Sequence, residues 1–174
     1  MPIRARYAHT NIVARDWRAL ADFYINVFGC ERVGPERNHH GPKIDALTGV
    51  RDARVPGAHL RLPGYGSGSE GVSEGVSEGG SGGGSGGGSG GTSGGPTLEI
   101  FEYNHEADWV EPAINRRGFA HIAFEVDDVA AARQLVRDHG GRDYGEMVTM
   151  QVANAGTITL IYMTDPEGNI IELQ

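Results

Sequence analysis

Hydrophobic and polar positions alternate in short runs that predict β-strands, and the most informative of these runs belong to a pattern that occurs twice. The first copy begins at residues 7–13 and the second at residues 119–126. In each run, small and aliphatic residues occupy every second position, and a histidine, His9 or His121, stands on the opposite side of the strand. We therefore expect each histidine to lie on the sheet face that the aliphatic residues leave free.

Each of these strands is followed by an amphipathic helix that has an aspartate at its start. Asp16 precedes the first helix, and Asp128 or Asp127 precedes the second, in the position where a carboxylate caps a helix. His9 precedes Asp16 by seven residues and His121 precedes Asp128 by seven, so the two copies share their spacing as well as their pattern. A glycine ends each helix. The apolar stripe of each helix should cover the aliphatic face of its own sheet.

Further strand-like runs follow each helix and complete the predicted fold. In the first copy they are residues 58–62 and 98–103, with a weaker candidate at 44–50, and in the second they are residues 147–152, 158–163 and 169–173. Each copy thus consists of a strand, a helix and about three more strands, which predicts an α+β fold of two βαβββ modules. Module one should cover about residues 5–104 and module two about residues 117–174, within a single domain of residues 1–174.

A glycine- and serine-rich segment, residues 66–95, interrupts module one between two of its expected strands. Of its 30 residues, 16 are glycine, 8 are serine and 3 are glutamate. Such a composition cannot bury enough apolar surface to offset its ordering entropy, so we expect a flexible coil at a hairpin tip. A native low-complexity insertion and an engineered linker would look the same at this position.

Charge and composition exclude several classes of partner. The net charge is −8, and it is −5 without the three glutamates of residues 66–95. Lys43 is the only lysine and no basic run occurs, so a nucleic-acid partner is not expected. No apolar run approaches the roughly 20 residues of a membrane helix, and the N-terminus has no signal-like region. The single cysteine, Cys30, excludes an intramolecular disulfide and favours a cytoplasmic location.

Two glutamates fall on the same expected faces as the two histidines. Glu99 alternates with Leu98 and Ile100, and Glu172 occupies the corresponding position in the last strand. If the modules are related by pseudo-symmetry, His9, Glu99, His121 and Glu172 meet on one concave surface. Nitrogen and oxygen donors of this kind suit a six-coordinate divalent metal with two positions open to water, such as nickel, cobalt, zinc, manganese or iron(II).

The whole chain outside residues 66–95 resembles the vicinal oxygen chelate superfamily, which includes glyoxalase I, methylmalonyl-CoA epimerase, extradiol dioxygenases, and fosfomycin and bleomycin resistance proteins. The matching stretches are residues 9–13 with Asp16, 21–24 with Gly29, 98–100, 118–123 and, most specifically, 165–173, which read Asp-Pro-Glu-Gly-Asn-Ile-Ile-Glu-Leu. The resemblance implies paired βαβββ modules that form a cup around a metal, usually in a homodimer. In some members the ligands of one site come from two chains.

The complete His, Glu, His, Glu set is most similar to glyoxalase I. That similarity implies a lyase or isomerase in which a glutamate ligand, Glu172 or Glu99, takes a proton from the carbon beside a chelated carbonyl of a small-molecule substrate. Phe101 and Tyr103 should share the face of Glu99, where they either contact the substrate or pack at the sheet edge. Further candidates for substrate binding are Asn11 and the Arg116–Arg117 pair, which either grips an anionic substrate or is a solvated loop.

Departures from glyoxalase I keep other functions open. Val13 stands where an arginine often grips the carboxylate of glutathione, and Tyr103 stands where an asparagine is common, so glutathione is not implied as the substrate. The alternatives are an acyl-CoA epimerase, a ring-cleaving dioxygenase, or a non-catalytic module that binds a small molecule or confers resistance. His39 and His40 are expected in an exposed loop, and His59 and His105 are also expected to be surface residues. The thiol of Cys30 is expected to be inert.

Overall fold

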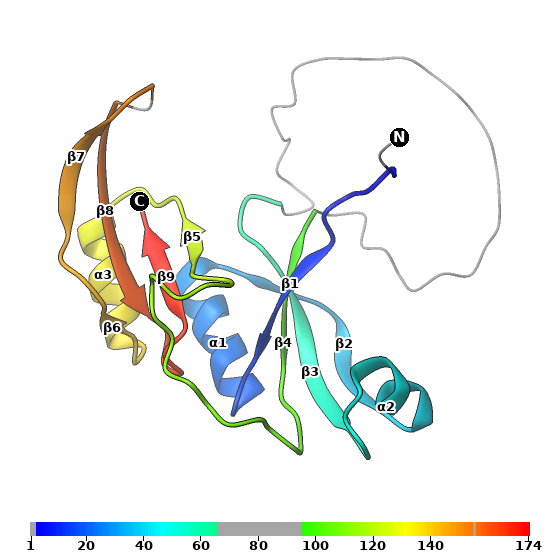
Figure 1. Ribbon diagram of the computed structural model, residues 1–174. Coiled ribbons are helices and arrows are strands. Elements are labelled where there is room, and N and C mark those ends of the chain that lie inside the picture. The colour runs from blue at the N-terminus through cyan, green and yellow to red at the C-terminus, as the bar shows by residue number, and fades with distance from the viewer. Residues whose placement is uncertain (1–2, 66–94, 155) are drawn as a thin grey trace, which may run out of the picture.

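The computed structural model describes residues 3–65, 95–154 and 156–174. The coil predicted for residues 66–95 lies outside this range except for Gly95. The first sheet contains four strands in the order β1-β4-β3-β2 (Figure 1). Their bounds are β1 His9–Val13, β2 Glu31–His40, β3 Arg54–Arg61 and β4 Thr97–Phe101. Strand β1 runs parallel to β4, while β3 pairs with β4 and β2 in antiparallel register.

The second sheet repeats this arrangement with strands from the other half of the chain. Its order is β5-β9-β8-β6, and β7 pairs with β8 beyond that path. The bounds are β5 Ile122–Phe124, β6 Arg142–Asp143, β7 Val148–Val152, β8 Gly156–Thr164 and β9 Ile170–Leu173. As in the first sheet, the first strand is parallel to the last and the others are antiparallel. The predicted α+β fold with a repeated module is therefore confirmed.

Helices α1 (Trp17–Phe28) and α3 (Val129–Asp138) follow the first strand of each sheet, as the repeat predicts. The Asp16 carboxylate accepts hydrogen bonds from the amides of Arg18 and Ala19, and Asp128, not Asp127, does the same at α3. Helix α1 ends at Gly29, whose φ of 69° is in the left-handed region that favours glycine. At the end of α3 the cap is His139, and the expected glycine follows it. Of the described helices, none has the length and apolar character needed to cross a membrane.

The strand suggested for residues 44–50 is wrong, because this segment forms helix α2 (Pro42–Thr48). Proline occupies its first turn, where no amide donor is needed, and the Asp45 carboxylate accepts hydrogen bonds from the amides of Asp52 and Ala53 just beyond it. The missing strand is β2, which contains His39 and His40, two residues that were expected in a loop. Most of its residues are exposed, so β2 carries no apolar alternation that would have identified it.

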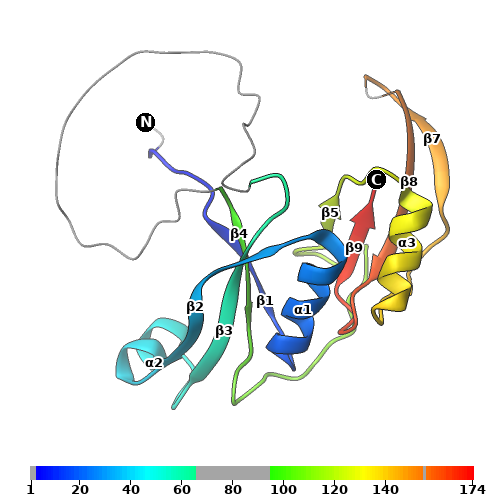
Figure 2. The same ribbon diagram turned by 180° about the vertical axis from the view of Figure 1, so that it is seen from behind.

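The aliphatic faces of the two sheets pack into one core, with α1 between them (Figures 1 and 2). Leu98 and Ile100 of β4 join the same buried cluster as Ile171 of β9. Across the junction, the rings of Phe28 and Phe124 stack with centroids 3.9 Å apart. Because the helix-covered faces meet in this core, the opposite faces of both sheets are left outside it.

Gly57 lies where β3 and β4 approach each other so closely that there is no room for a side chain. A Cβ atom at this position would overlap the carbonyl oxygen of Ile100 and the ring of Phe101. We expect Gly57→Ala to reduce the free energy of unfolding by about 1–3 kcal/mol, because a well-packed neighbour must shift. Urea denaturation would measure this change. Gly145→Ala is the control, since no atom lies within 4 Å of the added methyl group there. Equal unfolding midpoints for the two variants would contradict the prediction.

Candidate functional site

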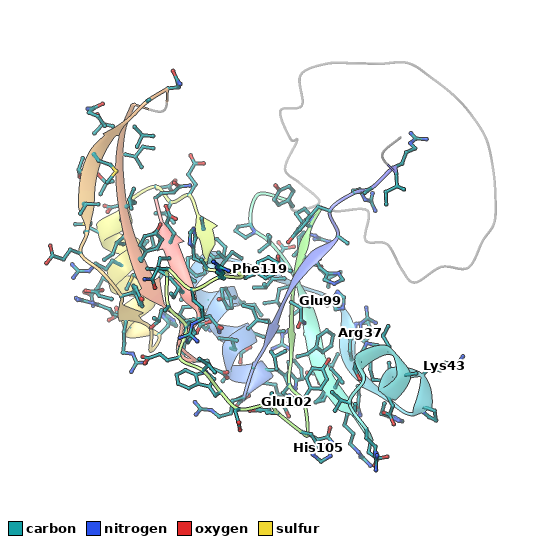
Figure 3. The ribbon with its side chains drawn as sticks, in the orientation of Figure 1. Arg37, Lys43, Glu99, Glu102, His105 and Phe119 are labelled. Atoms are coloured by element: carbon teal, nitrogen blue, oxygen red, sulfur yellow. The ribbon has the colours of Figure 1, made fainter. Side chains whose placement is uncertain are left out.

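The first half of the predicted metal centre lies on the first sheet, on the face that the helices leave uncovered. His9 of β1 and Glu99 of β4 come from adjacent strands, and the His9 Nε2 atom is 3.3 Å from Glu99 Oε2. The Glu99 side chain is only 13% exposed, whereas that of His9 is 46% exposed. The histidine is therefore more accessible to solvent than the carboxylate of Glu99. Glu99 is labelled on the first sheet in Figure 3.

A second histidine, His59 of β3, holds the other oxygen of the same carboxylate. Its Nε2 atom is 3.0 Å from Glu99 Oε1, because residues 59 and 99 face each other in the β3–β4 register. The imidazole is 23% exposed, so the expectation of a simple surface residue was wrong. Burial lowers the pKa of His59; Glu99 opposes this effect, and the positive charge of Arg37 adds to it. His59 could have been found from the strand pairing, but residues 66–95 separate the two strands in the sequence.

The second half of the centre lies on the equivalent face of the second sheet. The His121 Nε2 atom is 2.9 Å from Glu172 Oε2. Tyr162 of β8 faces Glu172 in the β8–β9 register, which brings its ring to the same face as the carboxylate. Burial raises the pKa of Tyr162, and the nearby Glu172 charge raises it further. Tyr162 thus occupies the place in the second module that His59 occupies in the first.

The four predicted ligands occur as two separate pairs within one chain. Among the described residues, no group of three or more histidine, cysteine, aspartate or glutamate side chains has an arrangement that could hold a metal ion. A cavity of about 880 Å³ opens beside Glu99, and neither His121 nor Glu172 lines it. Each pair offers one imidazole nitrogen and one carboxylate, which is half of the expected donor set.

The predicted substrate-binding residues have different environments. Asn11 lies opposite Glu99 and its amide group donates to the Glu99 main-chain oxygen at 3.5 Å. Phe101 is buried on the Glu99 face, with its ring centroid 5.9 Å from that of His59. Tyr103 packs against the small buried cluster that Phe101 forms with Ala53 and Val55. Arg117 is exposed and does not line the cavity beside Glu99.

Besides His9 and Glu99, that cavity is lined by residues that the sequence alone did not single out. They include basic and aromatic side chains from the segment before β1, from β2 and from the segment that precedes residue 66: Arg6, Tyr7, Arg37, His39 and Tyr65. We call this cavity the Glu99 groove.

Cys30 lies away from this groove, in the core. It is buried, and burial raises the pKa of its thiol to about 12. A thiol with such a pKa is a poor nucleophile and a poor metal ligand at neutral pH, in agreement with the expected inert residue.

The chain belongs to the Glyoxalase/Bleomycin resistance protein/Dioxygenase superfamily, whose family model matches residues 6–173. No curated protein matches the sequence significantly. Among solved structures, the chain is similar to a glyoxalase family protein from Bacillus cereus, with a TM-score of 0.64 and 19% identity over 99% of this chain and 93% of that one. It is also similar to a variant of glyoxalase I from Zea mays, with a TM-score of 0.52 and 18% identity over 97% of this chain and 43% of that one. At these identities the likeness concerns the fold.

Proposed function

We propose that this protein is a metal-dependent lyase or isomerase of the glyoxalase type, and that a second copy of the chain completes each metal site. The observation that carries the proposal is the repeated histidine–glutamate pair. His9 with Glu99 and His121 with Glu172 occupy equivalent positions on the uncovered faces of two equivalent sheets. A chance surface polar pair would not be expected to recur at the same place in both modules.

The residues of both pairs fit a divalent cation when one pair from each of two chains is combined. The two Nε2 atoms and the two carboxylates give a nitrogen and oxygen donor set without thiolate. His59 and Tyr162 lie beside the carboxylates, as residues that orient metal ligands do. A cation held there would polarise a carbonyl oxygen and offset the negative charge that develops when the neighbouring carbon loses a proton.

The protein's own contribution to the reaction is to position and move that proton. A glutamate, Glu172 or Glu99, takes the proton from the carbon beside the carbonyl and returns it to the adjacent carbon, which completes the isomerisation. The partly buried positions of both carboxylates keep them close to the sheet and ready for this transfer. His59 restricts the orientation of Glu99 through its contact with Oε1, and Tyr162, opposite Glu172 in the strand register, has the equivalent place in the second module.

Exposed apolar groups of the second module support association with a second copy. Phe119, two residues before His121, is completely exposed in the connection that leads into β5 (Figure 3). Strand β7 is exposed along its whole length and presents Val148, Met150 and Val152. Large exposed apolar surfaces mark sites of protein association, and a dimer would cover these groups while bringing the two half-sites together.

Subunit mixing would test this arrangement by metal content. One variant carries His9→Ala and Glu99→Gln, and the other carries His121→Ala and Glu172→Gln. We expect each variant alone to lose tight binding of nickel, zinc or manganese. Unfolded together and refolded as a mixture, they should recover about a quarter of the wild-type metal, because half of the dimers are mixed and each mixed dimer has one intact site. Elemental analysis after dialysis would measure this.

The other outcomes are equally informative. If each site lies within one chain, the mixture binds no more metal than the separate variants, and the shared-site arrangement is wrong. If the wild-type protein retains none of these metals, metal-dependent catalysis is wrong and a metal-free binding module becomes the better account of the cup. Size-exclusion chromatography with light scattering provides the dimer control for both measurements.

A further inference from the structure

We infer that Arg37 forms an oxyanion-binding subsite in the Glu99 groove, so that the substrate carries a carboxylate or phosphate group in addition to its reactive carbonyl. The inference deepens the proposed function by giving the chemical class of the substrate, and it rests on that function for the role of Glu99. It does not depend on the metal itself.

The strand register places Arg37 on the same sheet face as Glu99. In the β2–β3 register, Arg37 is paired with Gly57. The neighbouring row on the same face of the sheet contains Val33, His59 and Glu99. The register shifts between Val33 and Arg37, and in that irregular stretch the Arg37 guanidinium turns back toward Gly34. A Cβ atom on Gly34 would lie 3.6 Å from Arg37 Nη2. The guanidinium is therefore directed along the groove toward the row that contains Glu99, and both Arg37 and Glu99 line this groove.

Arg37 also differs from neighbouring arginines in having no carboxylate partner among the described residues. Arg18 pairs with Glu36 at 2.8 Å, Arg32 pairs with Asp22 at 2.8 Å, and Arg61 is 3.0 Å from Glu31. Within the part of the chain that the structure describes, no such ion pair involves Arg37, although its side chain is half-buried. A partly desolvated cation without a counter-ion favours binding of an external anion.

The surroundings of Arg37 suit an oxyanion at one end of an elongated small molecule. A guanidinium presents parallel N–H donors that match the two oxygens of a carboxylate or phosphate. Arg6 lines the same groove and adds a second guanidinium charge, while Tyr7 and Tyr65 provide aromatic walls. Glu99 is the acidic side chain among the described residues of the lining, and its carboxylate already has histidines on both oxygens. A small molecule whose anionic group binds Arg37 would therefore extend along the groove toward Glu99.

Arg37 is a different residue from the candidate that the sequence suggested for this role. Arg117 was a candidate for gripping an anionic substrate, but it lies outside the Glu99 groove. The polar strand β2 was not predicted, so its residues could not be assigned to the face of Glu99 before the register was known.

Calorimetric titration of metal-free protein with inorganic phosphate and, separately, with glutarate would test the subsite. Both titrations are done at low ionic strength, where exposed charges are least screened. We expect wild-type protein to bind at least one of the two probes saturably, and Arg37→Gln to bind it at least about tenfold more weakly. Arg18→Gln removes the same charge from a side chain that does not line the groove, and its affinity should stay within about twofold of wild type. Stronger binding of phosphate indicates a phosphate ester as the substrate, and stronger binding of glutarate indicates a carboxylate.

A third variant, Arg37→Lys, keeps the charge but removes the paired donors, and it should bind more weakly than wild type. Circular dichroism melting curves establish that the variants are folded. The inference is overturned if neither probe binds saturably, if Arg37→Gln binds as wild type does, or if Arg18→Gln loses affinity to the same extent. Because metal is absent from these titrations, failed metal retention together with Arg37-dependent anion binding would contradict only the proposed function. Intact metal retention without anion binding would contradict only the subsite.

Discussion

Replacing Glu172 with glutamine should reduce proton abstraction by about 10³-fold or more while the protein stays folded. Glutamine keeps the shape of the side chain and a carbonyl oxygen that can still face His121 and Tyr162. It cannot accept the proton at neutral pH, and general acid–base catalysis alone contributes about 10²- to 10⁴-fold. Loss of deuterium from the carbon beside the carbonyl of small 2-oxo and 2-hydroxy carbonyl compounds, followed by NMR with added metal, measures this step directly.

Glu99→Gln, measured alongside Glu172→Gln, distinguishes the two possible bases. The variant that lacks the base should lose exchange even when it is saturated with metal, whereas loss of a ligand alone should be partly recovered at high metal concentration. Glu146→Gln is the matched control, because Glu146 is exposed in the loop between β6 and β7, which carries neither of the site pairs. Unchanged exchange in Glu172→Gln and in Glu99→Gln would show that neither carboxylate acts as the base, and the proposed mechanism would then be wrong.

Asp165→Ala should lower the free energy of unfolding by about 3–5 kcal/mol, which is the largest stability effect that we expect from a single substitution. The Asp165 side chain is completely buried between the modules. It accepts hydrogen bonds from the Tyr24 hydroxyl at 3.0 Å, from the amides of Glu167 and Asn169 at 2.9 Å, and from Asn169 Nδ2 at 2.8 Å. Alanine would leave all of these donors without their partner in a region from which water is excluded.

Urea denaturation of Asp165→Ala, with Asp127→Ala as an exposed control, would measure this cost. The dependence on pH provides an independent check with Asp165→Asn. Burial raises the pKa of Asp165, so the folded protein retains this proton at pH values where the unfolded chain has released it. Wild-type stability relative to Asp165→Asn should therefore fall as the pH rises from the ordinary aspartate pKa to the raised one. Equal stability of wild type and Asp165→Ala at neutral pH would contradict the importance of this buried carboxylate.

Local chemistry explains the parts of the fold that could be predicted from the sequence. Asp16 and Asp128 cap helices because a short carboxylate side chain reaches the free amides of the first turn, which is a property of a few neighbouring residues. The secondary structure of residues 31–50 was predicted wrongly because it depends on residues that are distant in the chain. Strand β2 is mostly exposed and includes Gly34 and Pro35, so its extended form comes from pairing with β3 rather than from its own pattern.

The residues of the candidate site also fall into those that the local sequence pattern predicts and those that it does not. Alternation alone placed His9, Glu99, His121 and Glu172 on the faces opposite the aliphatic residues, because side chains of a strand point alternately to its two sides. The partners of the two carboxylates required the strand register, which is set by pairing between distant segments. Thus His59 and Tyr162 were identified only when β3 was seen to face β4 and β8 to face β9.

The repeated module, the helix caps and the faces of the predicted ligands could be derived from the sequence, since each follows from residues that are close in the chain. The packing of the modules against each other became known only from the three-dimensional structure. The aliphatic faces of both sheets are buried in one core around α1, through contacts such as that between Phe28 and Phe124. This burial removes the most apolar surface from water, and it leaves the His9–Glu99 and His121–Glu172 pairs apart on faces outside the core.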